Sequence, residues 1–154
     1  MVLRQNFSLP VDCVLRKATP EDIWAIRFLV FGAKLDPTQL LWQQFWVIEH
    51  NHKLIACCQL RNFPQAQELG SLVVTPKWRH KGLGTFLTSH LIQQATQPLY
   101  LECLGRKLVD FYRRLNFVPI EYEQLPESLK RKFGLSNLGK KLVGVPVTYM
   151  GYRE

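Results

Sequence analysis

A basic segment at positions 79–84 contains the residue types and spacing that most directly indicate chemistry. It follows an apolar run, precedes an amphipathic one, and reads Arg79-His80-Lys81-Gly82-Leu83-Gly84. The first N–H groups of a helix lack partners within the helix, and the helix dipole places partial positive charge there. Glycines let an anion approach those groups, and Arg79 and Lys81 add formal charge. The residues alone predict either a phosphate-binding helix start or an ordinary basic turn, and they leave both open.

The common nucleotide-binding loops match this segment less well. Leu87 occupies the place of the third glycine in a G-x-G-x-x-G pattern, and no Gly-Lys-Ser/Thr follows. The formal net charge of +8 leaves nucleic acid, a phosphate-bearing cofactor and plain solubility as explanations.

The elements that must position this segment are indicated by hydrophobic spacing and by turn residues. Before it, the pattern predicts a strand at 13–16 and a helix opened by Thr19-Pro20-Glu21-Asp22. A second helix is predicted to open at Asp36-Pro37-Thr38-Gln39 and to carry Leu40, Leu41 and Gln44. A hairpin of 45–48 and 53–60 around a turn at 50–52 follows, and then a strand at 68–74. After it, the pattern predicts a helix at 82–94, a strand at 99–104, an amphipathic helix containing Leu108, Phe111, Tyr112 and Leu115, a strand at 117–122, a short helix at 127–133 and a strand at 142–149. This order predicts an α/β protein with a mixed sheet and helices on both faces.

Length and composition place the chain among ordinary globular proteins. Its 154 residues, 47% hydrophobic and 21% charged, predict a single domain over residues 1–154. The four cysteines have no metal-ligand spacing, and His50 and His52 lack a third ligand, so we expect reduced thiols and no metal. We find neither a signal peptide nor a membrane-spanning run, and we expect a soluble, cytoplasmic protein.

Two motifs in order resemble the GCN5-related N-acetyltransferase (GNAT) family. Arg79-x-x-Gly82-x-Gly84, after the apolar run 72–74, resembles its acetyl-CoA pyrophosphate loop, and the run 111–117, which begins Phe-Tyr and ends Asn-Phe, resembles its late helix motif. The resemblance covers nearly the whole chain. It implies a central mixed, mostly antiparallel sheet of about six to seven strands, with a splayed parallel pair and helices on both faces.

The resemblance also implies acetyl-CoA as co-substrate and a set of site residues. The backbone of Leu72, Val73 and Val74 would bind the pantetheine arm, and the pyrophosphate would lie on Arg79, His80, Lys81, Gly82, Leu83, Gly84 and Thr85. Glu68 stands where some members have their general base, and the alternative is a solvated strand glutamate. Tyr112 matches the usual general acid near the sulfur, and the alternative is a core aromatic.

The sequence departs from the family pattern at two positions. Gly105 stands where an asparagine often contacts the cofactor arm, and Asn116 replaces a glycine, although asparagine also suits a left-handed helix cap. The family builds its acceptor pocket near the first two helices, where the sequence is rich in aromatic residues. We expect most of these to be core and one or two to line the pocket: Trp24, Phe28, Phe31, Trp42, Phe45 and Trp46.

The predicted function is therefore transfer of an acetyl group to a primary amine, on a small molecule or a protein, by a monomer or homodimer. A second reading is a catalytically weak CoA-binding sensor or scaffold of the same fold, which the substitution at Gly105 keeps open. A third, a nucleic-acid binder, is disfavoured because no aromatic stacking platform accompanies the basic segment. We expect no membrane partner.

Overall fold

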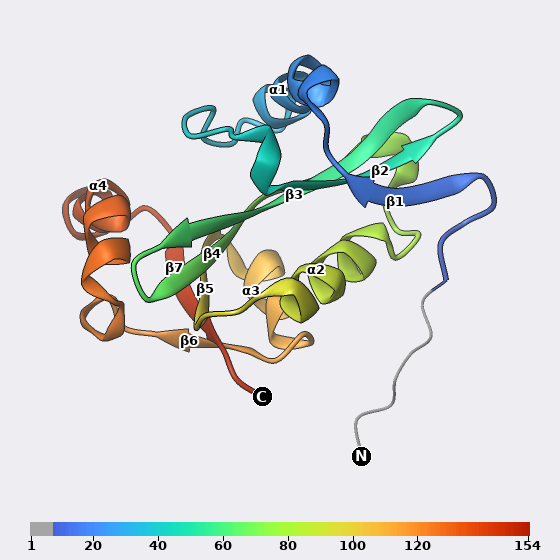
Figure 1. The fold of residues 1–154 in the computed structure, drawn as a ribbon. Helices are drawn as coiled ribbons and strands as arrows, with labels where there is room; N and C mark the ends of the chain where they lie inside the picture. Colours follow the sequence, from blue (N-terminus) through green and yellow to red (C-terminus); the bar gives the residue numbers. More distant parts are fainter. Residues whose placement is uncertain (1–7) are drawn as a thin grey trace. The chain divides into compact units, whose positions relative to one another are not determined.

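Within residues 8–154, which the computed structural model describes, seven strands form one sheet in the order β1-β2-β3-β4-β5-β7-β6 (Figure 1). The strands are β1 (Cys13–Lys17), β2 (Phe45–His50), β3 (Lys53–Phe63), β4 (Ala66–Val74), β5 (Leu99–Leu104), β6 (Phe117–Ile120) and β7 (Val147–Tyr152). The helices are α1 (Ile23–Gly32), α2 (Leu83–Gln94), α3 (Arg106–Arg113) and α4 (Glu127–Val143).

The predicted mixed, mostly antiparallel sheet with one parallel pair is confirmed. Strands β1 and β2, β2 and β3, β5 and β7, and β6 and β7 pair antiparallel, whereas β4 pairs parallel with β5. The parallel pairing joins only Gln67 to Leu99 and Glu68 to Tyr100. The hairpin between β2 and β3 turns at Asn51 and His52, whose φ angles of +49° and +64° suit a two-residue turn.

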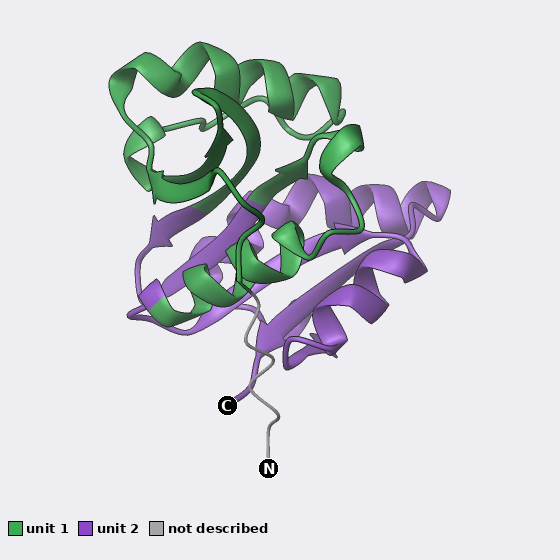
Figure 2. Ribbon diagram, turned by 90° about the vertical axis from the view of Figure 1, so that its right-hand side faces the viewer, with its two compact units in different colours: residues 1–59, 71–93 green, residues 60–70, 94–154 purple. Residues whose placement is uncertain are grey.

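The chain divides into two compact units, of residues 1–59 and 71–93 and of residues 60–70 and 94–154 (Figure 2). We call them unit 1 and unit 2. In unit 1, α1 buries Ile26 and Val30 in a core with residues of β2, β3 and β4: Phe45, Val47, Leu54, Cys57 and Val73. In unit 2, α4 buries Leu129 and Phe133 in a core with Val147 and Tyr149 of β7. Strands β3 and β4 each contribute residues to both units.

The predicted second helix at 36–44 is wrong. Only a single 3₁₀ turn forms there, at Trp42–Gln44. Asp36 Oδ1 accepts hydrogen bonds from the backbone N–H of Thr38 at 2.8 Å and from its hydroxyl at 2.6 Å, so the expected helix start is used to close a turn. Gln39 then has a φ of +57°, which no α-helix accommodates.

The prediction for residues 127–149 is also wrong in its boundaries. The predicted short helix continues as α4 to Val143, and the predicted strand at 142–149 begins only at Val147. Gly144, with a φ of +70°, ends the helix, and its N–H bonds to the carbonyl of Lys140. The apolar pair Leu142-Val143 suggested a strand, but both side chains lie exposed on the last turn of the helix.

Candidate active site

The predicted cofactor loop connects β4 to α2 within unit 1. After the 3₁₀ turn Pro76–Trp78, His80 has a φ of +62° and Gly82 a φ of +81°. Left-handed residues set among ordinary ones turn backbone N–H groups toward a common side, which is the geometry of an anion-binding nest. Arg79, His80 and Lys81 are exposed, and residues 71–93 contain no aspartate or glutamate. The loop therefore fits a diphosphate.

Contacts within unit 1 hold this loop in place. Arg79 Nε donates to the carbonyl of Val74 at 3.1 Å, which ties the loop to the end of β4. Thr75 N–H donates to the carbonyl of Ile55 at 2.9 Å, and Trp78 N–H to that of Thr75 at 2.9 Å. The Trp78 ring lies 5.4 Å from Lys81 Nζ. The sequence prediction assigned Arg79 only to phosphate, whereas its side chain also supports the loop backbone.

Strand β4 contains a backbone irregularity at Ser71, just before the predicted thioester-binding residues. Ser71 has a φ of +52°, which non-glycine residues rarely adopt. Its carbonyl accepts a hydrogen bond from the thiol of Cys57 at 3.6 Å, and its hydroxyl contacts Gln59 Oε1 at 3.4 Å. Burial raises the pKa of the Cys57 thiol to about 12, so the thiol stays protonated and able to donate. No motif in the sequence indicates this support, because it comes from the neighbouring strand.

Glu68, the predicted general base, lies on β4 in unit 2 and is the centre of a buried charge cluster. Its side chain is 2% exposed, and Arg61 and Lys132 are 6% and 12% exposed. Arg61 Nη1 donates to Glu68 Oε1 at 2.8 Å. Lys132 Nζ of α4 contacts both carboxylate oxygens, at 2.6 Å and 2.7 Å. Glu68 is therefore neither solvated, as the alternative expectation had it, nor a lone carboxylate.

Glu102 on β5 is a second carboxylate of unit 2 that the sequence reading missed. The hydroxyl of Ser136 donates to Glu102 Oε2 at 2.7 Å and lies 3.1 Å from the hydroxyl of Tyr149. Burial raises the pKa of Glu102, and the hydrogen bond from Ser136 partly opposes that rise. A raised pKa brings a carboxyl group nearer to the range in which a general base works at neutral pH.

Tyr112, the predicted general acid, is buried in α3 of unit 2. Its ring lies edge-on to Phe111 at 4.9 Å and to Phe117 at 5.7 Å between ring centroids. The ring therefore packs in the core, as the alternative expectation had it. That packing is compatible with a role for the hydroxyl, and the role stays a prediction.

The two departures from the family pattern have backbone explanations. Gly105 precedes α3 with a φ of +86° and a ψ of 159°, a combination outside the left-handed helical region that essentially only glycine adopts. An asparagine there would be strained although an added Cβ would meet no atom within 4 Å. Asn116 has a φ of +67° and thus takes the left-handed conformation that was predicted for it.

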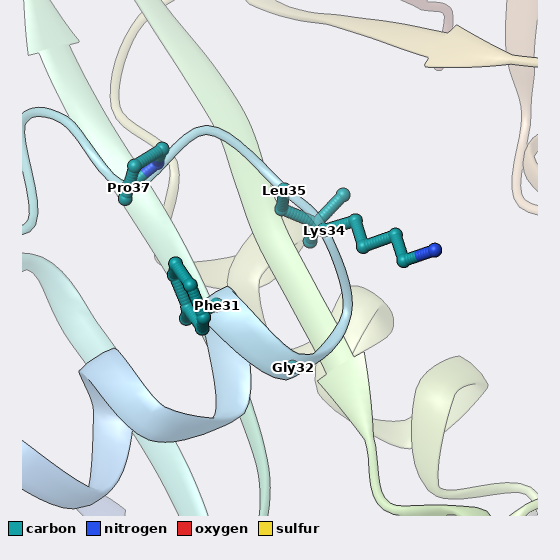
Figure 3. A pocket seen from close by; sticks show the side chains of 5 residues that line it. All are labelled: Phe31, Gly32, Lys34, Leu35 and Pro37. Atoms are coloured by element: carbon teal, nitrogen blue, oxygen red, sulfur yellow. The ribbon is translucent and has the colours of Figure 1, made fainter.

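The structure places the predicted site residues in both units. Leu72, Val73, Val74 and the loop from Arg79 to Thr85 belong to unit 1, whereas Glu68 and Tyr112 belong to unit 2. Of the six aromatic residues, Phe45 is core, and three lie exposed on α1: Trp24, Phe28 and Phe31. Phe31 lines a hollow of about 510 Å³ at the end of α1 (Figure 3).

Further features concern the described part of the chain as a whole. The four cysteines are free thiols. Among residues 8–154 there is no group of three or more His, Cys, Asp or Glu residues arranged to hold a metal ion. No helix described there combines the length and apolar character needed to cross a membrane.

A family model supports what the loop geometry suggested. The model of the acetyltransferase (GNAT) domain matches residues 42–119, about half of the chain, and the match includes β2 to β5, the loop and α3. The chain belongs to the GNAT family. The resemblance stated from the two motifs is thereby confirmed.

Curated relatives are similar to this chain over much of its length. The amino-acid acetyltransferase of Escherichia coli is 25% identical over 142 residues, which cover 84% of this chain and 32% of that protein. The amino-acid acetyltransferase of Photobacterium profundum is 30% identical over 105 residues, covering 66% of this chain and 24% of that protein. The chain thus spans a third or less of the length of these relatives.

Two solved structures share the fold. N-acetylglutamate synthase from Neisseria gonorrhoeae, complexed with coenzyme A and N-acetyl-glutamate, superposes with a TM-score of 0.76 at 21% identity, covering 95% of this chain and 36% of that one. Rv2747 from Mycobacterium tuberculosis, in complex with CoA and NLQ, superposes with a TM-score of 0.71 at 21% identity, covering 92% of this chain and 99% of that one. At these identities the likeness establishes the fold.

Proposed function

We propose that this GNAT protein transfers an acetyl group from acetyl-CoA to a primary amine. The observation that carries the proposal is the loop after β4, in which His80 and Gly82 take left-handed conformations at the start of α2 beside exposed basic side chains. The two similar structures, both complexed with coenzyme A, support the same ligand. The curated relatives, both amino-acid acetyltransferases, support an amino acid as the acceptor.

In this proposal, the backbone of unit 1 holds the cofactor. The N–H groups from Arg79 through Thr85 bind the pyrophosphate, and the backbone of Leu72 to Val74 binds the pantetheine arm and polarises the thioester carbonyl. Acetyl-CoA, when bound, supplies an acetyl group already activated as a thioester. Preorganised backbone donors at a developing oxyanion are worth about 3 kcal/mol each. The irregularity at Ser71 sets the direction of the three residues that follow it.

Proton transfer is assigned to side chains of unit 2. An alkylamine is mostly protonated at pH 7, so a base must accept its proton before attack. Glu68 remains the predicted base, but a proton accepted there would weaken its ion pairs with Arg61 and Lys132. Glu102 requires no such separation, and we propose it as the alternative base. Tyr112 remains the predicted acid for the departing thiolate.

The proposal is tested by cofactor binding and by thiol release. A ligand at ~100 times its Kd adds ~2.7 kcal/mol to stability, so acetyl-CoA should raise the Tm by several degrees. Gly82→Val should weaken CoA binding at least tenfold, since a β-branched side chain is strained at a φ of +81° and blocks the adjacent N–H groups. Free CoA should appear only when acetyl-CoA and an amine are both present.

Three results would contradict parts of the assignment. If millimolar acetyl-CoA does not change the Tm, both the cofactor assignment and the proposed transferase activity are wrong. Binding without thiol release across a broad panel of amines would favour the sensor or scaffold reading instead. A folded Gly82→Val protein that binds CoA normally would place the pyrophosphate elsewhere.

A further inference from the structure

The end of α1 carries a lysine in a conformation that favours glycine. The N–H of Lys34 bonds to the carbonyl of Phe31 at 3.0 Å, and the N–H of Leu35 to that of Val30 at 3.2 Å. These two bonds form the Schellman motif, in which the residue at the position of Lys34 is left-handed and most often glycine. Lys34 accordingly has a φ of +56°. A lysine at this position therefore carries a conformational cost that a glycine would not.

Lys34 borders the hollow of about 510 Å³ in unit 1, a volume within the range of small-molecule sites (Figure 3). The rest of the lining is Phe31, Gly32, Leu35 and Pro37, which is almost entirely apolar. Figure 3 shows the Phe31 side chain below the loop that carries Pro37, and the Lys34 side chain extending from the same loop to the side away from Phe31. The Phe31 side chain is 76% exposed although it is aromatic. Asp36 lies between the lining residues Leu35 and Pro37, but its carboxylate accepts two hydrogen bonds from Thr38. Among the five lining residues, Lys34 has the charged side chain, and its charge suits an anion.

Hydrogen bonds connect the loop around this hollow to the predicted thioester-binding strand. Gln59 Nε2, which is buried, donates to the carbonyl of Gln39 at 2.8 Å and to Gln44 Oε1 at 2.9 Å. Gln59 Oε1 lies 3.4 Å from the hydroxyl of Ser71, the residue directly before Leu72. Val30 of α1 and Val73 of β4 also belong to the same core cluster. The hollow is therefore held in a fixed relation to the backbone that would carry the acetyl group.

We propose that this hollow receives the side chain of the acceptor, and that the acceptor is an α-amino acid with an apolar side chain whose carboxylate pairs with Lys34. The inference rests on the proposed function and adds the acceptor class to it. An apolar lining stabilises an apolar side chain by burial, and one exposed lysine at the rim supplies the countercharge for a carboxylate. Acidic side chains such as that of glutamate are disfavoured because Lys34, the charged side chain of the lining, already pairs with the α-carboxylate and the other four lining residues are apolar.

The test compares pairs of amines that differ only in the carboxylate. Lys34→Gln should raise the KM of L-phenylalanine about fivefold, the effect of one exposed ion pair, and leave that of phenethylamine within twofold. Phe31→Ala should raise both KM values about tenfold, because both amines fill the hollow. Lys53→Gln, on the exposed β2–β3 hairpin, is the matched control and should change neither. Equal effects of Lys34→Gln on both amines, or a lower KM for L-glutamate than for L-phenylalanine, would overturn the proposal.

Lys34→Gly separates side-chain function from folding. Glycine suits the left-handed position, so this variant should melt at the same temperature or higher while showing the same fivefold loss for L-phenylalanine. Saturation-transfer NMR with N-acetyl-L-phenylalanine and CoA measures binding at the hollow without turnover. Contact signals that vanish in Phe31→Ala support the hollow as the binding site. This holds even if no amine causes thiol release, because the absence of release would contradict only the proposed activity. Signals unchanged by both Phe31→Ala and Lys34→Gly would refute the hollow as the binding site, whatever the enzyme does.

Discussion

Replacing Glu68 by glutamine tests whether the buried charge cluster stabilises the fold. The amide keeps the shape of the side chain but removes the negative charge that faces Arg61 and Lys132. Removing one partner of a buried ion pair costs about 3–5 kcal/mol, because the remaining charge stays in a low-dielectric environment. The glutamine oxygen still accepts one hydrogen bond, and Lys132 can extend toward solvent. We therefore expect the lower end, about 3 kcal/mol.

The assay is urea unfolding at pH 7, followed by tryptophan fluorescence, together with a thermal scan. For a chain of this size, about 3 kcal/mol corresponds to a fall in Tm of roughly 6–12 °C. Glu127→Gln is the matched control: Glu127 pairs with Lys130 at 3.3 Å but is 80% exposed. Its loss should change stability by less than about 0.5 kcal/mol. If the two variants differ by less than that margin, the cluster does not stabilise the fold as argued.

The same variant also separates two roles for Glu68. A fall in kcat without a fall in stability would identify Glu68 as a proton acceptor whose charge matters only for the reaction. A loss of stability with kcat nearly retained would leave Glu102 as the base. Loss of both would mean that the carboxylate serves the fold and the reaction together.

Two further variants address the surroundings of this cluster. Gly70→Ala would place a Cβ in collision with Arg61 Nη1, so the guanidinium must move away from Glu68, and we expect a cost of about 1–3 kcal/mol in urea unfolding. Gly139→Ala, whose nearest contact would be an ordinary 3.5 Å, should cost nothing, and equal costs would contradict this account. For Glu102, burial raises the pKa in the folded state, so its contribution to stability is present at low pH and is lost as pH rises through the folded pKa. In urea titrations, the stability of the wild type relative to Glu102→Gln should therefore decline as the pH rises above about 4.3, the ordinary pKa of a glutamate, and parallel profiles would refute this account.

The sequence predicted those features that depend on short-range backbone chemistry. The two-residue turn of the β2–β3 hairpin, the helix α2 and the left-handed Asn116 follow from residue types and spacing within a few positions. The loop from Arg79 to Gly84 was identified in the same way. It also carried the family resemblance, because a helix start that binds phosphate needs glycine and basic residues at fixed places in one short segment.

Local signals gave wrong predictions where two uses of the same residues compete. Asp36 and Thr38 suit a helix start, but they also close a turn by side-chain hydrogen bonds, and the turn forms. Leu142 and Val143 suit a strand, yet they continue α4 until Gly144 ends it. For α4, the burial of Leu129 and Phe133 in the core of unit 2 favours the helix.

The tertiary structure alone decided the environment of the reactive groups. Glu68 and Lys132 are 64 residues apart in sequence, so no period or motif could indicate that they form a buried ion pair. Cys57 and Gln59 support Ser71 from the neighbouring strand, and the hollow beside Lys34 depends on how α1 ends. The sequence by itself thus determined where the predicted phosphate-binding loop lies, because the proposed binding depends on contiguous backbone. The fold decided charge, burial and hydrogen bonding at the remaining site residues, because these depend on which distant segments pack against them.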